Sequence, residues 1–164
     1  MIEQLKELLE MQRVLDSSIL AKQGIRLYPK ELVQVALYVE LGELMNELPS
    51  CFKYWKESKV DNREKALIEY VDCLHFALSL ANNRGKAFEK DLSLNKDLYE
   101  YNEHKVASLS QMLINKLLVS ITLYEGDLSF LLGLGYKLGF TWDEIYKAYK
   151  EKNAINYERM MQNY

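Results

Sequence analysis

The sequence of 164 residues contains few of the residues that interrupt helices or crosslink a chain. It has only two prolines and seven glycines, and almost no stretch alternates between polar and apolar residues as a β-strand does, so helices are predicted throughout. Its two cysteines, Cys51 and Cys73, are too few for a disulfide scaffold. A reducing, cytoplasmic environment is therefore expected.

An excess of positive charge and long apolar runs are also missing. The formal net charge is −3, whereas a general nucleic-acid binder is usually basic, so no nucleic-acid partner is expected. No apolar run has transmembrane length, and the amphipathic N-terminus, MIEQLKELLEMQ, lacks the apolar core of a signal peptide. The sequence predicts no membrane partner, and its length fits a single domain over residues 1–164.

Helical periodicity divides the chain into about five to six helices of an all-α bundle. The first helix is predicted over 2–22 and the second over 29–48, between Gly24 and Pro49. A third begins at a capping pair formed by Asp61 and Glu64 and continues to about Ala81. The later predictions are a polar connector over 82–102, helices over 103–124 and 127–138, and a last helix over 142–161 that starts at a capping box formed by Thr141 and Glu144.

Two carboxylate pairs lie in the segment 39–76. Glu40 and Glu43 are three residues apart, as are Glu69 and Asp72, so each pair shares one face of a predicted helix. If the two helices face one another, four carboxylates surround one point, which requires a cation because like charges repel. Oxygen ligands of this kind suit Mg²⁺ or Mn²⁺ rather than zinc.

A solvated helix face is the simpler explanation of one E-x-x-E pattern, but both pairs lie among apolar residues, where ionised carboxylates need a partner. Gly42, between the first two glutamates, costs about 1 kcal/mol of helix stability relative to alanine, and a helix keeps such a residue where something approaches its backbone. A non-catalytic helical interaction protein with solvated acidic faces is the alternative. A zinc site would need Cys51, Cys73, His75 and His104, whose spacings do not suit a compact cluster.

Two further segments combine residues that bind nucleotides. The connector formed by Phe52, Lys53, Tyr54, Trp55 and Lys56 is typical of a stacking platform for a base, or of a helix corner filled with rings. In the last helix, Lys152, Asn156 and Arg159 share one face and could hold a polyphosphate. A solvated C-terminal helix whose cations suit the helix dipole has the same pattern.

Together these motifs resemble the all-α nucleoside triphosphate pyrophosphohydrolases, which include the MazG-like enzymes and the dimeric dUTPases. The similarity to the dUTPases rests on the F-K-Y-W-K connector, the D-x-x-H-F run from Asp72, the K-N-x-x-N-x-x-R pattern from Lys152 and the Q-x-x-L-D motif from Gln12. It spans about residues 11–164. One departure lies at the end, where the family has R-Q-x-x-G-Y and this chain has R-M-M-Q-N-Y.

The resemblance implies a dUTP diphosphatase that converts dUTP to dUMP and pyrophosphate by water attack, with dUDP as a second possible substrate. It implies Mg²⁺, or Mn²⁺ in its place, bound by Glu40, Glu43, Glu69 and Asp72, and Glu43 as the residue that orients or deprotonates the water. The alternative keeps this chemistry with dCTP or a noncanonical nucleotide, because the sequence does not show which base edge is read.

The resemblance also implies which residues bind the substrate. Gln12, Trp55 and Phe76 are expected at the base, and His75 at the deoxyribose. Lys56, Lys152 and Arg159 are expected at the phosphates, and Asn156 is expected to help close the site. A homodimer is implied as well, and the apolar segment 129–140 is either its surface or part of the core.

Overall fold

The computed structural model describes residues 1–85 and 108–162, and every regular element in these stretches is helical. The elements are α1 (Ile2–Lys22), α2 (Lys30–Asn46), the short 3-10 helix η1 (Pro49–Cys51), α3 (Arg63–Asn83), α7 (Ile114–Leu123), α8 (Leu128–Lys137) and α9 (Trp142–Met161). The predicted all-α bundle is confirmed, and α1 and α9 have the predicted bounds. None of the helices in the described stretches combines the length and apolar character needed to cross a membrane.

The second helix is shorter than the predicted range 29–48. Pro29 precedes it as the N-cap, and its carbonyl accepts from the backbone nitrogens of Leu32 and Val33 at 3.0 and 3.1 Å. At the other end, α2 stops at Asn46 and Pro49 opens η1 instead of following the helix directly. Proline fits the first turn of η1 because it has no N–H to satisfy there.

The predicted cap of α3 is wrong by one residue. Asn62 is the N-cap, and its side chain accepts from the backbone nitrogen of Lys65 at 3.1 Å. Asp61 instead accepts from the backbone nitrogen of Ser50 at 2.8 Å, and also from the Ser50 hydroxyl. The carboxylate therefore satisfies an unpaired N–H in η1, while the neighbouring amide caps the helix.

The predicted helix over 103–124 is interrupted in its described part. Leu113 has extended backbone angles (φ −64°, ψ 145°), and α7 begins only at Ile114. The helix ends before Gly126 as predicted, where φ is +77° and a Cβ would come within 2.9 Å of the Leu37 and Leu80 side chains. Residues 103–107 lie outside the described stretches, as does the connector over 86–102, whereas 82 and 83 still belong to α3.

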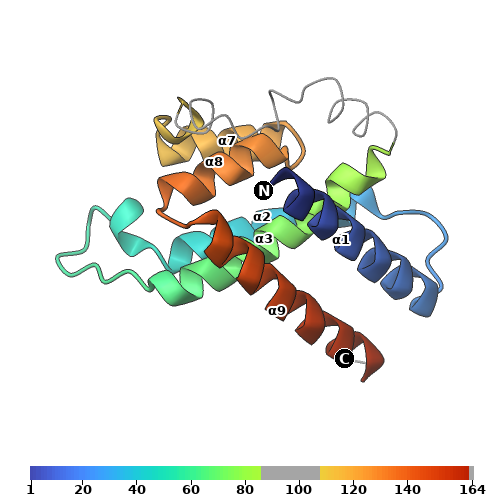
Figure 1. Cartoon of the computed structure of the whole chain (residues 1–164). Helices are drawn as coiled ribbons and strands as arrows, with labels where there is room; N and C mark the ends of the chain where they lie inside the picture. Colours follow the sequence, from blue (N-terminus) through green and yellow to red (C-terminus); the bar gives the residue numbers. More distant parts are fainter. Residues whose placement is uncertain (86–107, 163–164) are drawn as a thin grey trace.

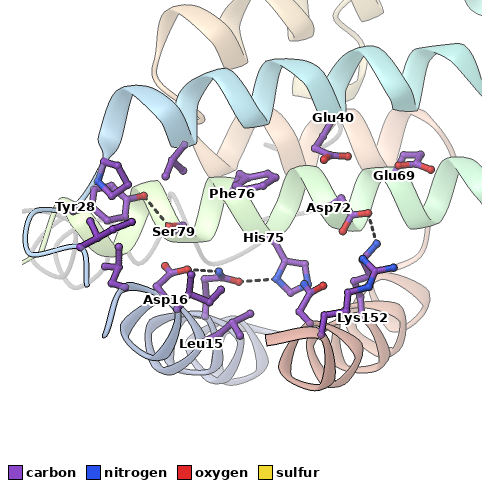
Figure 2. Close-up of a pocket in the computed structure, with 18 of the residues that line it drawn as sticks. Leu15, Asp16, Tyr28, Glu40, Glu69, Asp72, His75, Phe76, Ser79 and Lys152 are labelled. Atoms are coloured by element: carbon purple, nitrogen blue, oxygen red, sulfur yellow. Dashed lines mark hydrogen bonds and ion pairs between the residues drawn. The ribbon is translucent and has the colours of Figure 1, made fainter. Parts of the chain in front are cut away.

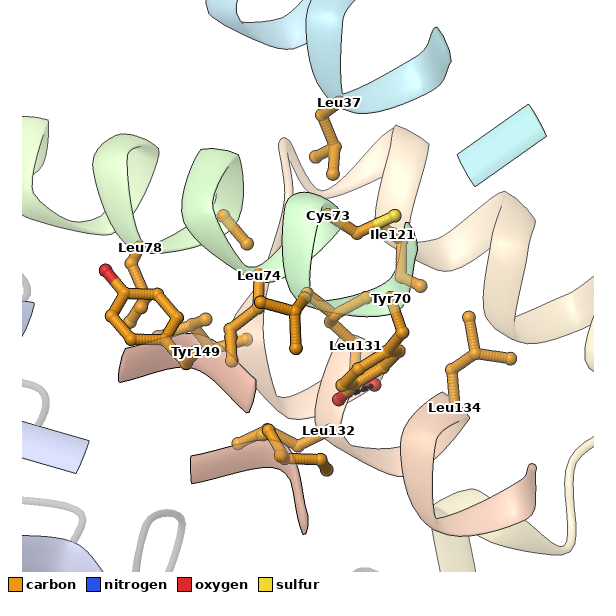
Figure 3. Close-up of a cluster of buried hydrophobic side chains, with 14 of the residues drawn as sticks. Leu37, Tyr70, Cys73, Leu74, Leu78, Ile121, Leu131, Leu132, Leu134 and Tyr149 are labelled. Carbon is orange, nitrogen blue, oxygen red and sulfur yellow. Dashed lines mark hydrogen bonds between the residues drawn. The ribbon is translucent and has the colours of Figure 1, made fainter. Parts of the chain in front are cut away.

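The core is built around α3, which contacts α1, α2, α8 and α9 (Figure 1). Tyr70 of α3 is fully buried beside Leu131 of α8, and its hydroxyl donates to the Leu131 carbonyl at 3.0 Å (Figure 3). At Gly135 of α8, a Cβ would lie 2.5 Å from that hydroxyl, so the ring and the helix fit only because a side chain is missing. The apolar part of the segment 129–140 is therefore mostly core, because residues 131–135 and Phe140 are buried within the chain.

Candidate active site

A pocket with a cavity volume of about 590 Å³ lies between α1, α2, α3 and α9. Its carboxylate end is formed by Glu40, Glu43, Glu69 and Asp72, and its hydrogen-bonded end by Gln12, Asp16, Tyr28 and Ser79. Figure 2 shows Phe76 and His75 between these two ends. The rest of the lining comes from Leu15, Ile19, Leu20, Ile25, Pro29, Val33, Lys152, Asn156 and Arg159.

The carboxylate end brings together both predicted pairs because α2 and α3 pack side by side. One carboxylate oxygen from each of Glu40, Glu43 and Glu69 lies within 4.8 Å of the other two. Asp72 lies in the same pocket but stands outside that group of three, and its Oδ2 accepts from Lys152 Nζ at 2.5 Å. One predicted metal ligand is thus already paired with a cation of the protein.

Charges crowd at this end. Burial and the carboxylates of Asp72, Glu43 and Glu69 raise the pKa of Glu40 to about 7. Burial and neighbouring carboxylates also raise the pKa of Glu69. Burial raises the pKa of Asp72 even though Lys152 opposes the change. An oxygen-only cluster with this excess of negative charge fits a hard divalent cation such as Mg²⁺ or Mn²⁺.

The last helix supplies the cations of the pocket. Lys152, Asn156 and Arg159 of α9 all line it, as their shared helical face predicts. The Lys152 side chain is only 19% exposed and lies against Asp72. These donors therefore lie next to the carboxylates. An anionic ligand bound there would bring further negative charge, which the cations of α9 would offset.

The hydrogen-bonded end contains a network that links α1 to α3 and α9. Gln12 Nε2 donates to Asp16 Oδ1 at 2.7 Å, and Gln12 Oε1 lies 2.7 Å from His75 Nδ1. The Tyr149 hydroxyl donates to the same Gln12 oxygen at 2.7 Å. Burial, and secondarily the charge of Lys152, lower the pKa of His75 to about 3, so this imidazole is neutral at physiological pH.

Sequence reasoning found Gln12 and His75 but assigned no function to the other polar residues here. The hydroxyls of Tyr28 and Ser79 lie 2.7 Å apart. Burial raises the pKa of Asp16, while Ser79 and Gln12 act to lower it. Only Asp16 had a signal, as the last residue of the Q-x-x-L-D motif. Tyr28 and Ser79 stand alone in ordinary sequence surroundings, so nothing in the sequence pointed to them.

Two predicted substrate residues do not line the pocket. Trp55 and Lys56 lie in the exposed connector between η1 and α3, where the Trp55 ring is 61% exposed and packs edge-on against Tyr54. Their assignment to the substrate stays a prediction. Of the four residues considered for zinc, Cys51 is exposed, Cys73 is buried in the core and His104 lies outside the described residues.

A helical bundle with carboxylates and cations at one end of a pocket suits an enzyme that acts on an anionic substrate. A family model described as dUTPase matches residues 4–164, nearly the whole chain, and the chain belongs to this family. It is accordingly an enzyme that hydrolyses dUTP, a dUTP diphosphatase, as the sequence motifs predict. A comparison with curated proteins found no match.

Proposed function

We propose that this dUTPase cleaves dUTP to dUMP and pyrophosphate by water attack, with a divalent cation at the carboxylate end of the pocket. The observation that carries the proposal is the approach of Glu40, Glu43 and Glu69, since one carboxylate oxygen from each lies within 4.8 Å of the other two. A triphosphate and this cluster are both anionic, so they can lie together only with a cation between them.

Glu40, Glu43, Glu69 and Asp72 are the residues that would hold Mg²⁺, or Mn²⁺ in its place. When bound, such an ion polarises phosphoryl oxygens and neutralises the charge that develops on the leaving pyrophosphate. Asp72 can contribute because a carboxylate has two oxygens, and Lys152 occupies only Oδ2.

Glu43 is assigned to the attacking water, which it orients and from which it takes a proton. The water oxygen forms a bond to phosphorus while the bridge between the first and second phosphates breaks. Lys152 and Arg159 line the pocket beside the carboxylates and are assigned to the phosphate oxygens, with Asn156 closing this end.

The rest of the nucleotide is assigned to the remainder of the pocket. With the triphosphate at the carboxylate end, the deoxyribose lies near His75 and the base reaches Phe76 and Gln12. Trp55 and Lys56 belong to an exposed connector next to α3, and we assign them to the base and phosphates respectively once substrate is bound.

The test is pyrophosphate release from dUTP, dCTP, dTTP, dATP, dGTP and UTP, each with Mg²⁺, with Mn²⁺ and with EDTA. The proposal predicts turnover confined to dUTP that EDTA abolishes. Turnover that survives EDTA would refute the metal site. Turnover of dCTP at a similar rate would keep the carboxylate mechanism and refute the assignment of the base pocket.

We also propose that two copies of the chain form a homodimer through the outer face of α2. Leu32, Val35 and Val39 are spaced by three and four residues along this face and are 71%, 57% and 52% exposed. Gly42 continues the stripe, and a Cβ there would meet nothing within 4 Å, so a second helix could approach closely. Burial of such a stripe against its own copy would stabilise a dimer.

Sedimentation or light scattering of Val35→Glu tests this surface, because a charge in the centre of the stripe disfavours its burial. The variant is expected to be monomeric. Val60→Glu, which changes an exposed valine outside α2, is the matched control and should keep the wild-type mass. A wild-type monomer would refute the dimer, and a dimeric Val35→Glu variant would refute this surface.

A further inference from the structure

One nitrogen of the His75 imidazole hydrogen-bonds to the protein, and the other has no partner in the described part of the chain. The residue is 4% exposed, and its ring stacks on that of Tyr149 with centroids 4.1 Å apart. Nδ1 lies 2.7 Å from Gln12 Oε1, whereas Nε2 is buried and has no hydrogen-bond partner among residues 1–85 and 108–162. A buried polar atom left unpaired in a pocket wall costs stability, so Nε2 is a candidate contact for a ligand.

The orientation of the Gln12 amide decides which nitrogen of His75 carries the proton. Asp16 accepts a hydrogen bond from Gln12 at 2.7 Å, and an ionised carboxylate can only accept. The amide nitrogen must therefore face Asp16, and the amide oxygen must face His75. Tyr149 reinforces this orientation because its hydroxyl donates to the same oxygen.

The amide oxygen of Gln12 has no proton, so His75 must donate to it from Nδ1. A neutral imidazole carries one N–H, and the burial of this ring keeps it neutral. With the proton on Nδ1, Nε2 has a free lone pair and can only accept a hydrogen bond. The ring lies between Asp16 on one side and Asp72 with Lys152 on the other (Figure 2).

We propose that Asp16 and Gln12, reinforced by Tyr149, are positioning residues that fix His75 in the Nδ1–H tautomer, so that Nε2 accepts a hydrogen bond from a hydroxyl group of the substrate. The location of that hydroxyl rests on the proposed function. With the triphosphate at the carboxylate end, the sugar lies near His75, and the single hydroxyl of the deoxyribose is the donor. The hydrogen bonds from Asp16 through Gln12 to His75 thus favour a ligand with a hydroxyl group next to His75 Nε2.

The tautomer can be measured without substrate by ¹⁵N NMR of histidine-labelled protein. The chain has only two histidines, so His104→Gln identifies the signals of His75. We expect a protonated Nδ1 and an unprotonated Nε2 in the wild-type protein. Gln12→Met removes the acceptor, and Asp16→Asn removes the constraint on the amide, so both should populate the Nε2–H form.

Tyr149→Phe is the matched control, because it keeps the stacked ring, Gln12 and Asp16, and it should keep the Nδ1–H form. A wild-type protein with Nε2 protonated would overturn the proposal. So would a pair of variants, Gln12→Met and Asp16→Asn, that both keep the wild-type tautomer. If Gln12→Met does not fold, the isosteric Asp16→Asn decides the question.

The hydroxyl contact is tested by comparing dUTP with 2′,3′-dideoxyuridine triphosphate. Loss of the donor should lower kcat/KM by about tenfold in the wild-type enzyme, the usual effect of one unmade hydrogen bond. In Gln12→Met and Asp16→Asn, the ratio of kcat/KM for dUTP to that for the dideoxy analogue should fall towards one. The reason is that Nε2 then carries a proton in part of the molecules and cannot accept from the hydroxyl. An unchanged ratio in both variants, or equal turnover of the two nucleotides by wild type, would overturn the contact. Absence of any dUTP turnover would instead refute the proposed function and leave the NMR result to decide the tautomer.

Discussion

At the carboxylate end of the pocket, like charges face one another, whereas at the hydrogen-bonded end each donor faces an acceptor. Glu40 and Glu69 have raised pKa values because burial and neighbouring carboxylates disfavour their ionised forms. Gln12, by contrast, donates to Asp16 and accepts from Tyr149. The first region needs an added cation to be stable when ionised. In the second region the protein's own groups pair with one another, except His75 Nε2, which has no partner among residues 1–85 and 108–162.

The largest effect is expected for Glu43→Gln, at the carboxylate end. We expect kcat for pyrophosphate release to fall by about 10³-fold, because glutamine cannot take a proton from water and is a weaker ligand. Unfolding by urea should show no loss of stability in EDTA, since one of several like charges is gone. Glu31→Gln, at an exposed position in the first turn of the same helix, should behave as wild type. A Glu43→Gln variant with kcat within tenfold of wild type would refute the assignment.

The second test concerns stability with and without metal. The pKa of Glu40 is raised from 4.5 to about 7, so between these values the folded protein binds more protons than the unfolded chain. The free energy of unfolding in EDTA should therefore fall as the pH rises through this window. Mg²⁺ at a hundred times its Kd should restore about 2.7 kcal/mol near neutral pH.

Glu40→Gln supplies the comparison for that experiment. Its urea midpoint in EDTA should fall less than that of wild type between about pH 5 and pH 8, because this group no longer titrates. Its stabilisation by Mg²⁺ should also be smaller. Equal pH profiles for the two proteins would show that crowding at the carboxylate end does not govern stability.

The third test is Lys152→Met. This change removes the cation that pairs with Asp72 at the carboxylate end and that, after burial, also lowers the pKa of His75 in the hydrogen-bonded network. The KM for dUTP should rise by at least about tenfold, because a hydrogen bond to a charged phosphate is worth about 1.5–3 kcal/mol. Lys147→Met, at a position of α9 whose side chain is 81% exposed, is the matched control. An unchanged KM would mean that Lys152 pairs with Asp72 and does not bind the phosphates.

The smallest expected effect is that of Tyr28→Phe at the hydrogen-bonded end. Loss of the bond to the Ser79 hydroxyl should lower the free energy of unfolding by about 1 kcal/mol. The response of stability to Mg²⁺ should not change. Tyr136→Phe, at an exposed ring, controls for the substitution itself. A reduced response to Mg²⁺ in Tyr28→Phe would show that the two ends are not independent.

Local sequence rules predicted much of the fold. The capping box of Thr141 and Glu144 is present at the start of α9, and the carboxylate pairs meet because helical spacing fixes their faces. The rules failed where either of two neighbouring residues could serve as the N-cap, as with Asp61 and Asn62 at the start of α3. They also failed at Leu113, since the break before α7 has no proline or glycine to mark it.

The hydrogen-bond network around His75 could not be predicted from the sequence, for a different reason. Gln12 and Tyr149 are separated by 137 residues and meet because α1 and α9 pack against each other as well as against α3. Tyr149 also looks like any buried aromatic residue in a helical stripe. Sequence motifs therefore pointed to candidate ligand-binding groups, but not to the buried residues that hydrogen-bond to those groups.

The placement of the pocket residues along α3 has a consequence for product release. Glu69, Asp72, His75 and Ser79 follow one another along the pocket at steps of about one helical turn, and from first to last the helix rises about 15 Å. Under the proposed assignment, the triphosphate of dUTP lies at the carboxylate end and its base reaches Phe76 and Gln12, so each half raises the effective concentration of the other at its own subsite. After cleavage, dUMP and pyrophosphate each keep only part of the contacts. If the assignment holds, the pocket binds the intact substrate more tightly than either product, and the shorter products dissociate more readily.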